Sequence, residues 1–518
     1  MKRRDVLKSV GMVAASSALG TRALSARAET VTTKSAPKRP NILVFLTDDQ
    51  GQWLQQAYGN SEVRTPNMSR IARRGVLMKN AFTTSPVCSP ARASFFTGRM
   101  PSQHGIHDWL EEIDHPYSYE YPWLKGQTLI SEPLKKAGYH TALVGKWHCG
   151  EGRDPHPGFD YWFSYWATQY PHRGEQNFSN NGKHLQENGF QSPFFTQKAI
   201  EFLHSHYNDS STAEKPFFLF VGYVDTHSPH IQMPKDLVAE YDDATFRDIP
   251  REKFLPVHGT AVDPVSPDPA VERRKHEQYY AAASSIDREV GKILDELEHM
   301  GKLDDTLVVY TGDHGLNAGQ HGIWEKGNGT VPQNFFEESI RIGCAISWPA
   351  GGIPSNLESD LPVNHCDTFQ TLLDIAGAVP DPTLARKINS PGRSYLRQLH
   401  GETIPDWKDA VILEYGNARM IRKDSYKLIL RYPFEGINFP NELYDLKADP
   451  RETTNIYDEP QHAQLVKELT EEIHAFFEKY TVPGHSGLDL ADQPPATTQS
   501  PWLRAVHLKE YGTVKVKL

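Results

Sequence analysis

The 518-residue sequence has few of the features that mark a nucleic-acid-binding, membrane-spanning or disulfide-stabilised protein. Its formal net charge is −10 and it has no strongly basic domain, so nucleic acid is not expected as its main partner. It has no apolar run near the roughly 20 residues that a membrane-spanning helix needs, and no internal repeats. Its four cysteines do not suggest a disulfide framework, although pairing among Cys149, Cys344 and Cys366 stays open.

The first 28 residues have the pattern of an export signal. A basic start that includes Arg3-Arg4 precedes an apolar run ending near Leu19, and Ala26-Arg27-Ala28 is typical of a cleavage site. The paired arginines favour the twin-arginine route over a Sec signal with a basic start. We therefore expect residues 1–28 to be a signal peptide, residues 29–39 to be a linker, and the mature protein to be periplasmic or secreted by a bacterium.

Four apolar runs, each ending in ionisable residues, predict the core of the fold. Such runs are typical of strands buried on both faces, and helical patterns, the strongest at 277–300, lie between them. Any one of these polar clusters could be a solvated turn. In an α/β sheet, however, ligands bind at the carboxyl ends of the strands, so we expect the four clusters to converge on one site. The runs are 41–47, 141–145, 217–224 and 307–311, followed by Asp48-Asp49, Lys146-Trp147-His148, Asp225-Thr226-His227 and Gly312-Asp313-His314.

The pattern changes after about residue 400. Short alternating stretches at 410–415, 418–421 and 427–431, followed by an amphipathic stretch at 463–480, predict a small antiparallel sheet with a helix. The tail from Pro483 is expected to be loop. We thus expect a large mixed or mostly parallel α/β domain over 40–409, and a smaller C-terminal subdomain with its tail over 410–518.

The stretch from Ser85 to Gly98 carries the clearest chemical motif. From the residues alone, Cys88 is either a thiolate nucleophile activated by Arg92 or an inert buried cysteine. Cys88, Pro90 and Arg92, followed by Thr97-Gly98-Arg99, closely resemble the signature of the formylglycine-dependent sulfatases of the alkaline-phosphatase-like superfamily. The resemblance extends to about Asn455. It implies that a formylglycine-generating enzyme oxidises the cysteine to an aldehyde, whose hydrate attacks sulfur.

The resemblance also implies a metal site and a set of catalytic side chains. The residues that match calcium ligands are Asp48, Asp49, Cys88, Asp313 and His314, where His314 replaces the commoner asparagine and leaves another divalent cation open. The residues that match catalytic positions are Cys88, Arg92, Lys146, His148, His227 and Lys326.

Each of these catalytic residues has an implied role. Arg92 and Lys146 would clamp the hydrate and the sulfate, and His148 would take a proton from the second hydroxyl. His227 and Lys326 would face the leaving oxygen. His321 is a candidate substrate contact or a simple loop residue, and His230 is expected in a surface turn.

The sequence therefore predicts a sulfuric ester hydrolase with one Ca²⁺ per chain and a formylglycine at position 88. The export signal and aromatic residues expected in loops indicate a sulfated carbohydrate as substrate; these residues are Tyr161, Trp162, Trp166 and Tyr170. The alternatives are a broad arylsulfatase, a phosphonate monoester hydrolase or phosphodiesterase on the same scaffold, a silent binding protein, and a thiol hydrolase. The sugar, the hydroxyl position, exo or endo action and the oligomeric state are left open.

Overall fold

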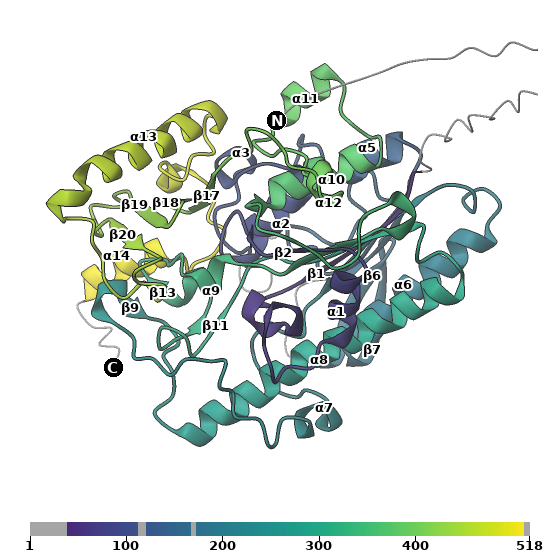
Figure 1. Cartoon of the computed structure of the whole chain (residues 1–518), viewed down its shortest axis with the longest axis horizontal. Helices are drawn as coiled ribbons and strands as arrows, with labels where there is room; N and C mark the ends of the chain where they lie inside the picture. Colours follow the sequence, from purple (N-terminus) through teal and green to yellow (C-terminus); the bar gives the residue numbers. More distant parts are fainter. Residues whose placement is uncertain (1–38, 112–120, 167–171, 512–518) are drawn as a thin grey trace, which may run out of the picture. The chain divides into compact units, whose positions relative to one another are not determined.

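A ten-stranded sheet organises the molecule, with strand order β15-β2-β14-β10-β1-β8-β4-β5-β6-β7 (Figure 1). The computed structural model describes residues 39–111, 121–166 and 172–511, so the expected signal peptide and nearly all of the linker lie outside the described residues. The strands are β1 (Asn41–Thr47), β2 (Val76–Met78), β4 (His140–Gly145), β5 (Tyr161–Tyr165), β6 (Arg173–Asn180), β7 (Lys183–Phe190), β8 (Phe217–Tyr223), β10 (Thr306–Gly312), β14 (Cys344–Ser347) and β15 (Leu357–Ser359).

The four apolar runs of the sequence form neighbouring parallel strands. β1 pairs in parallel with β10 and β8, and β8 pairs in parallel with β4. Thr47 lies opposite both Gly312 and Tyr223, so these strands end at the same level. Their carboxyl ends therefore deliver the polar clusters to one edge of the sheet.

Helices cover both faces of this sheet because the side chains of β1 alternate between two apolar layers. Leu43 and Phe45 pack against α1 (Pro66–Arg73), α6 (Gln191–Asn208) and α8 (Pro269–His299). Ile42, Val44 and Leu46 pack in the layer that contains α2 (Cys88–Thr97), α5 (Ser131–Lys136) and α10 (His365–Ile375). The expected α/β fold class is confirmed.

A separate four-stranded antiparallel sheet follows in the sequence: β17 (Ala410–Tyr415), β18 (Ala418–Lys423), β19 (Tyr426–Arg431) and β20 (Glu442–Asp445). One face packs on α13 (Ala463–Tyr480) through Ile421, Leu428 and Ile473. The other packs on Phe82 and Phe335 of the large domain.

The remaining elements are short. They are β3 (Ala81–Phe82), β9 (Thr260–Ala261), β11 (Asn317–Ala318), β12 (Trp324–Glu325), β13 (Thr330–Val331), β16 (Val363–Asn364), α3 (Pro101–His104), α7 (Lys235–Ala239), α9 (Glu337–Ile340), α11 (Pro382–Ile388), α12 (Leu396–Leu399) and α14 (Pro501–Tyr511). Within the described ranges, no helix combines the length and the apolar character needed to cross a membrane.

Several sequence expectations are corrected. Tyr161 and Trp162 belong to strand β5 rather than a loop, and Trp162 is fully buried because it packs on other aromatic rings of the core. The C-terminal tail contains α14, which the Pro- and Thr-rich composition before it concealed. All four cysteines are free and buried, so none is paired. Tyr170 lies outside the described residues.

Candidate active site

The residues that follow the four parallel strands meet at the first turn of α2. Cys88 is the first residue of this helix and is 1% exposed. Asp48, Asp49, Asp313 and His314 are fully buried around it. His314 Nε2 lies 3.3 Å from Cys88 Sγ and 3.3 Å from Asp49 Oδ1. The predicted metal ligands therefore lie together, as two overlapping groups of potential ligand atoms around Cys88.

The orientation of His314 is fixed by a main-chain contact. Its Nδ1 lies 2.9 Å from the carbonyl oxygen of Gly315, which can only accept a hydrogen bond, so Nδ1 carries the proton. Burial lowers the pKa of His314 well below its ordinary value, and the ring is neutral. Its Nε2 lone pair therefore points at the carboxylates and at Cys88, as a metal ligand requires.

Three cationic side chains contact the three carboxylates. Arg92 Nε donates to Asp313 Oδ2 at 2.9 Å. Lys146 Nζ donates to Asp48 Oδ2 at 2.5 Å, and Lys326 Nζ contacts both oxygens of Asp49 at 2.8 and 2.6 Å. Each acid thus has at least one basic partner, since Arg92 Nη2 also lies 3.5 Å from Asp48 Oδ1, and all six side chains are buried.

Burial and mutual repulsion shape the titration of the carboxyl groups. Burial raises the pKa of Asp49 to about 7. Burial and the charge of Asp48 raise the pKa of Asp313 well above its ordinary value. Burial acts in the same sense on Asp48, but Lys146 and Arg92 outweigh it and hold the pKa of that carboxyl well below its usual range. The site concentrates negative charge that a bound cation would stabilise.

The cysteine is in a poor environment for a thiolate. Burial and the charge of Asp48 raise the pKa of the Cys88 thiol well above its ordinary value, despite Lys146 and Lys326 nearby. A nucleophilic cysteine needs the opposite shift. The geometry therefore disfavours a hydrolase that uses the thiol directly.

Two histidine rings, His148 and His227, lie beside the cluster. His148 Nε2 donates to the carbonyl oxygen of Leu110 at 3.0 Å, and its buried Nδ1 has no hydrogen-bond partner in the described parts of the chain. His227 Nδ1 donates to the Ser228 carbonyl oxygen at 2.6 Å, and its Nε2 lies 3.4 Å from Lys326 Nζ. Burial lowers the pKa of both rings well below the ordinary value, so both are neutral bases.

His321 lies in a different cluster from the other predicted residues. Its Nε2 lies 2.9 Å from Glu338 Oε2, and its ring stacks on Phe336 with a centroid distance of 3.8 Å. The main-chain N–H of His321 donates to Glu252 Oε2 at 2.7 Å. These contacts connect the glycine-rich loop to its surroundings and indicate a structural role.

Two supporting residues were missed by sequence reasoning. Tyr279 Oη donates to the Asp49 carbonyl oxygen at 2.6 Å, at a residue whose φ of 54° is left-handed and therefore strained. His172 Nε2 contacts the His227 carbonyl oxygen at 2.9 Å. In the sequence, Tyr279 fits the pattern of buried positions along α8, so no sequence signal indicates its contact with Asp49. His230, expected in a surface turn, packs its half-buried ring on Tyr279 and Trp324.

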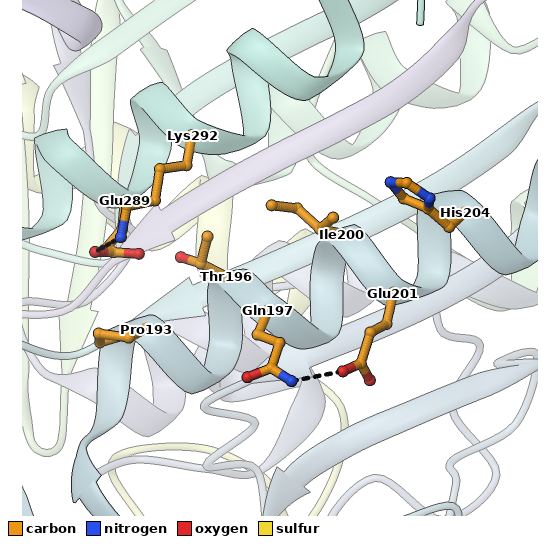
Figure 2. Close-up of a pocket in the computed structure, with 8 residues that line it drawn as sticks. All are labelled: Pro193, Thr196, Gln197, Ile200, Glu201, His204, Glu289 and Lys292. Atoms are coloured by element: carbon orange, nitrogen blue, oxygen red, sulfur yellow. Dashed lines mark hydrogen bonds and ion pairs between the residues drawn. The ribbon is translucent and has the colours of Figure 1, made fainter. Parts of the chain in front are cut away.

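A hollow of about 580 Å³ between α6 and α8 contains none of these residues (Figure 2). Its charged side chains bind each other: Lys292 Nζ lies 2.6 Å from Glu289 Oε1. Gln197 Nε2 likewise donates to Glu201 Oε1 at 2.7 Å. Because Lys292 is paired with Glu289, and none of the predicted site residues lines this hollow, it is not a second candidate for the active site.

Comparison with known families agrees with the geometry. The Sulfatase family model matches residues 40–378, more than half of the chain, and the model "N-sulphoglucosamine sulphohydrolase, C-terminal" matches residues 319–479. The chain therefore belongs to the sulfatase family of the alkaline-phosphatase-like superfamily and is a sulfuric ester hydrolase.

Individual relatives show how far the similarity extends. The N-acetylglucosamine-6-O-sulfatase of Bacteroides thetaiotaomicron is 28% identical over 84% of this chain and 86% of its own. A solved structure in complex with its substrate D-glucosamine-2-N,6-O-disulfate has a TM-score of 0.71 at 24% identity, covering 86% of this chain and 98% of that one. The phosphonate monoester hydrolase of Agrobacterium radiobacter has a TM-score of 0.62 at 20% identity, covering 85% and 96%. These two structures share the fold.

Replacing His321 by alanine should lower stability and leave catalysis intact. The change removes the contact with Glu338 and the stacking on Phe336, and the loss of such a hydrogen bond costs about 1–3 kcal/mol. We expect a lower melting temperature, with kcat and KM for 4-nitrophenyl sulfate within about twofold of wild type because no reacting group is touched. A large rise in KM at unchanged stability would instead make His321 a substrate contact.

Proposed function

We propose that this enzyme removes sulfate from a sulfated carbohydrate outside the cytoplasm, with a formylglycine formed from Cys88 and one Ca²⁺. The observation that supports the proposal best is the convergence of three carboxylates and His314 on Cys88, with Arg92, Lys146 and Lys326 around them. The proposal includes residues 1–28 as a twin-arginine signal, residues 40–409 as the catalytic domain and residues 410–518 as the C-terminal subdomain and tail.

The donor set fits a hard divalent cation. Asp48, Asp49, Asp313 and His314 would hold it, together with an oxygen on position 88 in place of Cys88 Sγ. Asp48 Oδ1 is buried and accepts no hydrogen bond within the described residues, although Arg92 Nη2 lies 3.5 Å away. Carboxylate oxygens are the ligands that Ca²⁺ prefers. When bound, the cation would polarise the sulfate and stabilise negative charge on the nucleophilic oxygen.

The first chemical step needs an oxygen nucleophile at position 88. One hydroxyl of the hydrated aldehyde would give its proton to Asp313, whose pKa is raised by burial, and would form a bond to sulfur while the bond from sulfur to the ester oxygen breaks. Arg92 and Lys146, which contact Asp313 and Asp48, would bind the hydrate and the sulfate oxygens. A guanidinium suits this role because its planar fork binds oxyanions through two parallel hydrogen bonds.

The departing alcohol oxygen needs a proton. Burial would lower the pKa of Lys326, but Asp49 outweighs it and raises that pKa well above its ordinary value, so the ammonium is charged. His227 is neutral and lies 3.4 Å from it. We therefore assign the proton to Lys326, with His227 as its partner at the leaving oxygen.

The last step releases sulfate and restores the aldehyde. His148 Nδ1 is a buried bare nitrogen and would accept the proton of the second hydroxyl. As that oxygen forms the C=O bond, the bond from the same carbon to the sulfated oxygen breaks and sulfate leaves. Addition of water to the aldehyde then regenerates the hydrate.

The substrate class is supported by the relatives. The Bacteroides relative is named for a sulfated amino sugar, and the solved structure contains a glucosamine disulfate. The shared fold of the phosphonate monoester hydrolase makes phosphodiesters the second candidate substrates. Running sugar sulfates, 4-nitrophenyl sulfate and a phosphonate monoester side by side tests the choice, and preferential hydrolysis of the phosphonate would reject it.

Conversion of Cys88 should be measurable and essential. Protein made with a maturation enzyme should yield a position-88 peptide in which CHO replaces CH₂–SH, detected by mass spectrometry after aldehyde trapping. Cys88→Ala and Cys88→Ser should fold with an unchanged melting temperature and lose all turnover, because neither can form the aldehyde. Near-normal activity of purified Cys88→Ala would refute the mechanism.

Calcium should stabilise the enzyme through the carboxylate cluster. Adding Ca²⁺ to EDTA-treated protein should raise the melting temperature, since a ligand at 100 times its Kd contributes about 2.7 kcal/mol. Asp313→Asn should abolish the shift. Glu338→Gln, in the His321 cluster, is the matched control and should keep it. A larger shift with Mg²⁺ or Mn²⁺ would reject calcium as the native ion.

Loss of the proton donor should depend on the leaving group. Lys326→Ala should slow hydrolysis of sugar sulfates by about 10²–10⁴-fold, the usual contribution of positioned proton transfer, and slow 4-nitrophenyl sulfate much less because nitrophenolate leaves without a proton. Lys198→Ala, which removes an ion pair with Glu201 on α6, should change neither rate. Equal losses on both substrates would remove Lys326 from this role.

A further inference from the structure

A second pocket lies at the opposite end of helix α2 from Cys88. It has a volume of about 580 Å³ and is lined by Arg99, Tyr121, Lys125, Gln127 and parts of the C-terminal tail, including His485. The ten residues of α2 separate it from the active site by about 15 Å, at 1.5 Å per residue. None of the catalytic or metal-site residues lines it.

Arg99 is the unusual feature of this pocket. Its Nη1 donates to Gln127 Oε1 at 2.7 Å, whereas its buried Nε has no hydrogen-bond partner in the described structure. None of the ion pairs among the described residues involves Arg99. Burial lowers the pKa of Arg99, and no acidic neighbour in the described ranges offsets this effect. A partly buried guanidinium without a carboxylate is costly unless a ligand supplies the negative charge.

The surrounding structure holds Arg99 in this position. Gly98 ends α2 with a left-handed φ of 67°. The amide of Gln127 is fixed because its Nε2 donates to the His104 carbonyl oxygen at 3.0 Å. The negative end of the α2 dipole favours a cation here but supplies no acceptor to Nε. The guanidinium is thus oriented by a neutral amide, which leaves its charge available.

Among the described residues that line the pocket, the other charged groups leave it positive. Lys125 is exposed at its rim, and Asp492 is the acid that lines the same pocket, without an ion pair to Arg99. Burial lowers the pKa of His104 well below its ordinary value, so it adds no charge. The hollow between α6 and α8 has the same volume, but there Lys292 is paired with Glu289. The two pockets therefore differ in that the cation of one has a carboxylate partner and Arg99 has none among the described residues.

We propose that the Arg99 pocket is a second oxyanion site, which binds a sulfate group carried by a sugar and so holds a sulfated polymer on the enzyme away from the active site. The nature of the ligand rests on the proposed function. A guanidinium binds oxyanions strongly because its hydrogen bonds to them are charge-assisted. The half-buried ring of Tyr121 lines the same pocket and offers an apolar surface for a sugar; it packs edge-on against the buried Trp123, with ring centroids 4.7 Å apart.

Retardation in native gels that contain sulfated dextran tests this site without turnover. In the full-length Cys88→Ala protein, Arg99→Gln should weaken the apparent affinity for sulfated dextran about tenfold, the effect of losing one charge-assisted hydrogen bond. Lys125→Gln, at an exposed position that cannot impair folding, should weaken it about twofold. Arg397→Gln, which removes the same charge from an exposed ion pair with Glu402, should have no effect. Unchanged affinity in both Arg99→Gln and Lys125→Gln overturns the proposal.

Two further measurements identify the ligand of the Arg99 pocket and distinguish a failure of this proposal from a failure of the proposed function. Calorimetric titration with inorganic sulfate should show a much weaker Arg99-dependent site than sulfated dextran does; equal affinity per sulfate would make free sulfate the ligand and overturn the sugar assignment. In the converted enzyme, Arg99→Gln should keep kcat/KM for 4-nitrophenyl sulfate within about twofold, because α2 separates the two sites. Absence of turnover in wild type would refute the proposed function, whereas the gel experiment would still show whether the Arg99 pocket binds sulfated dextran.

Discussion

The fold depends on balancing three carboxylates that are buried side by side. Asp48, Asp49 and Asp313 are fully buried at the ends of two adjacent strands, where each disfavours ionisation of the others. An unpaired buried charge costs several kcal/mol. Lys146, Arg92 and Lys326 supply one positive charge to each acid. Burying these charges opposes folding. The same carboxylates can bind a cation, and the same basic side chains can bind an anion beside it.

The balancing charges come from three separate segments of the chain. Arg92 belongs to α2, Lys146 follows β4, and Lys326 follows β12. The backbone is also held under strain at this edge, since Asp49 and His148 both have left-handed φ angles, of 54° and 56°. Tyr279 from α8 secures the Asp49 carbonyl. The site is therefore complete only when the sheet and the helices on both of its faces have assembled, which couples reactivity to the native packing.

The sequence predicted the α/β architecture well because buried parallel strands leave an unambiguous apolar pattern, as 41–47 and 307–311 show. It predicted which polar residues meet because their strands end at one edge. It failed where tertiary packing decides the outcome, because Trp162, expected in a loop, is a core residue. It left the role of His321 open, and the structure shows this side chain in contact with Glu338. Which of two neighbouring groups carries a proton, as at Lys326 and His227, depends on distances that no sequence pattern contains.

The burial of Cys88 has a consequence for the order of events in the life of the chain. The side chain is 1% exposed at the first turn of a helix packed between the sheet and α10. In the proposed function a maturation enzyme oxidises this side chain, and the folded protein buries the thiol away from contact with a second protein. The proposed modification would therefore precede the docking of α2. On this proposal the chemical state of one side chain is decided before folding is complete, and a chain that folds with an unmodified Cys88 is inactive for as long as it stays folded.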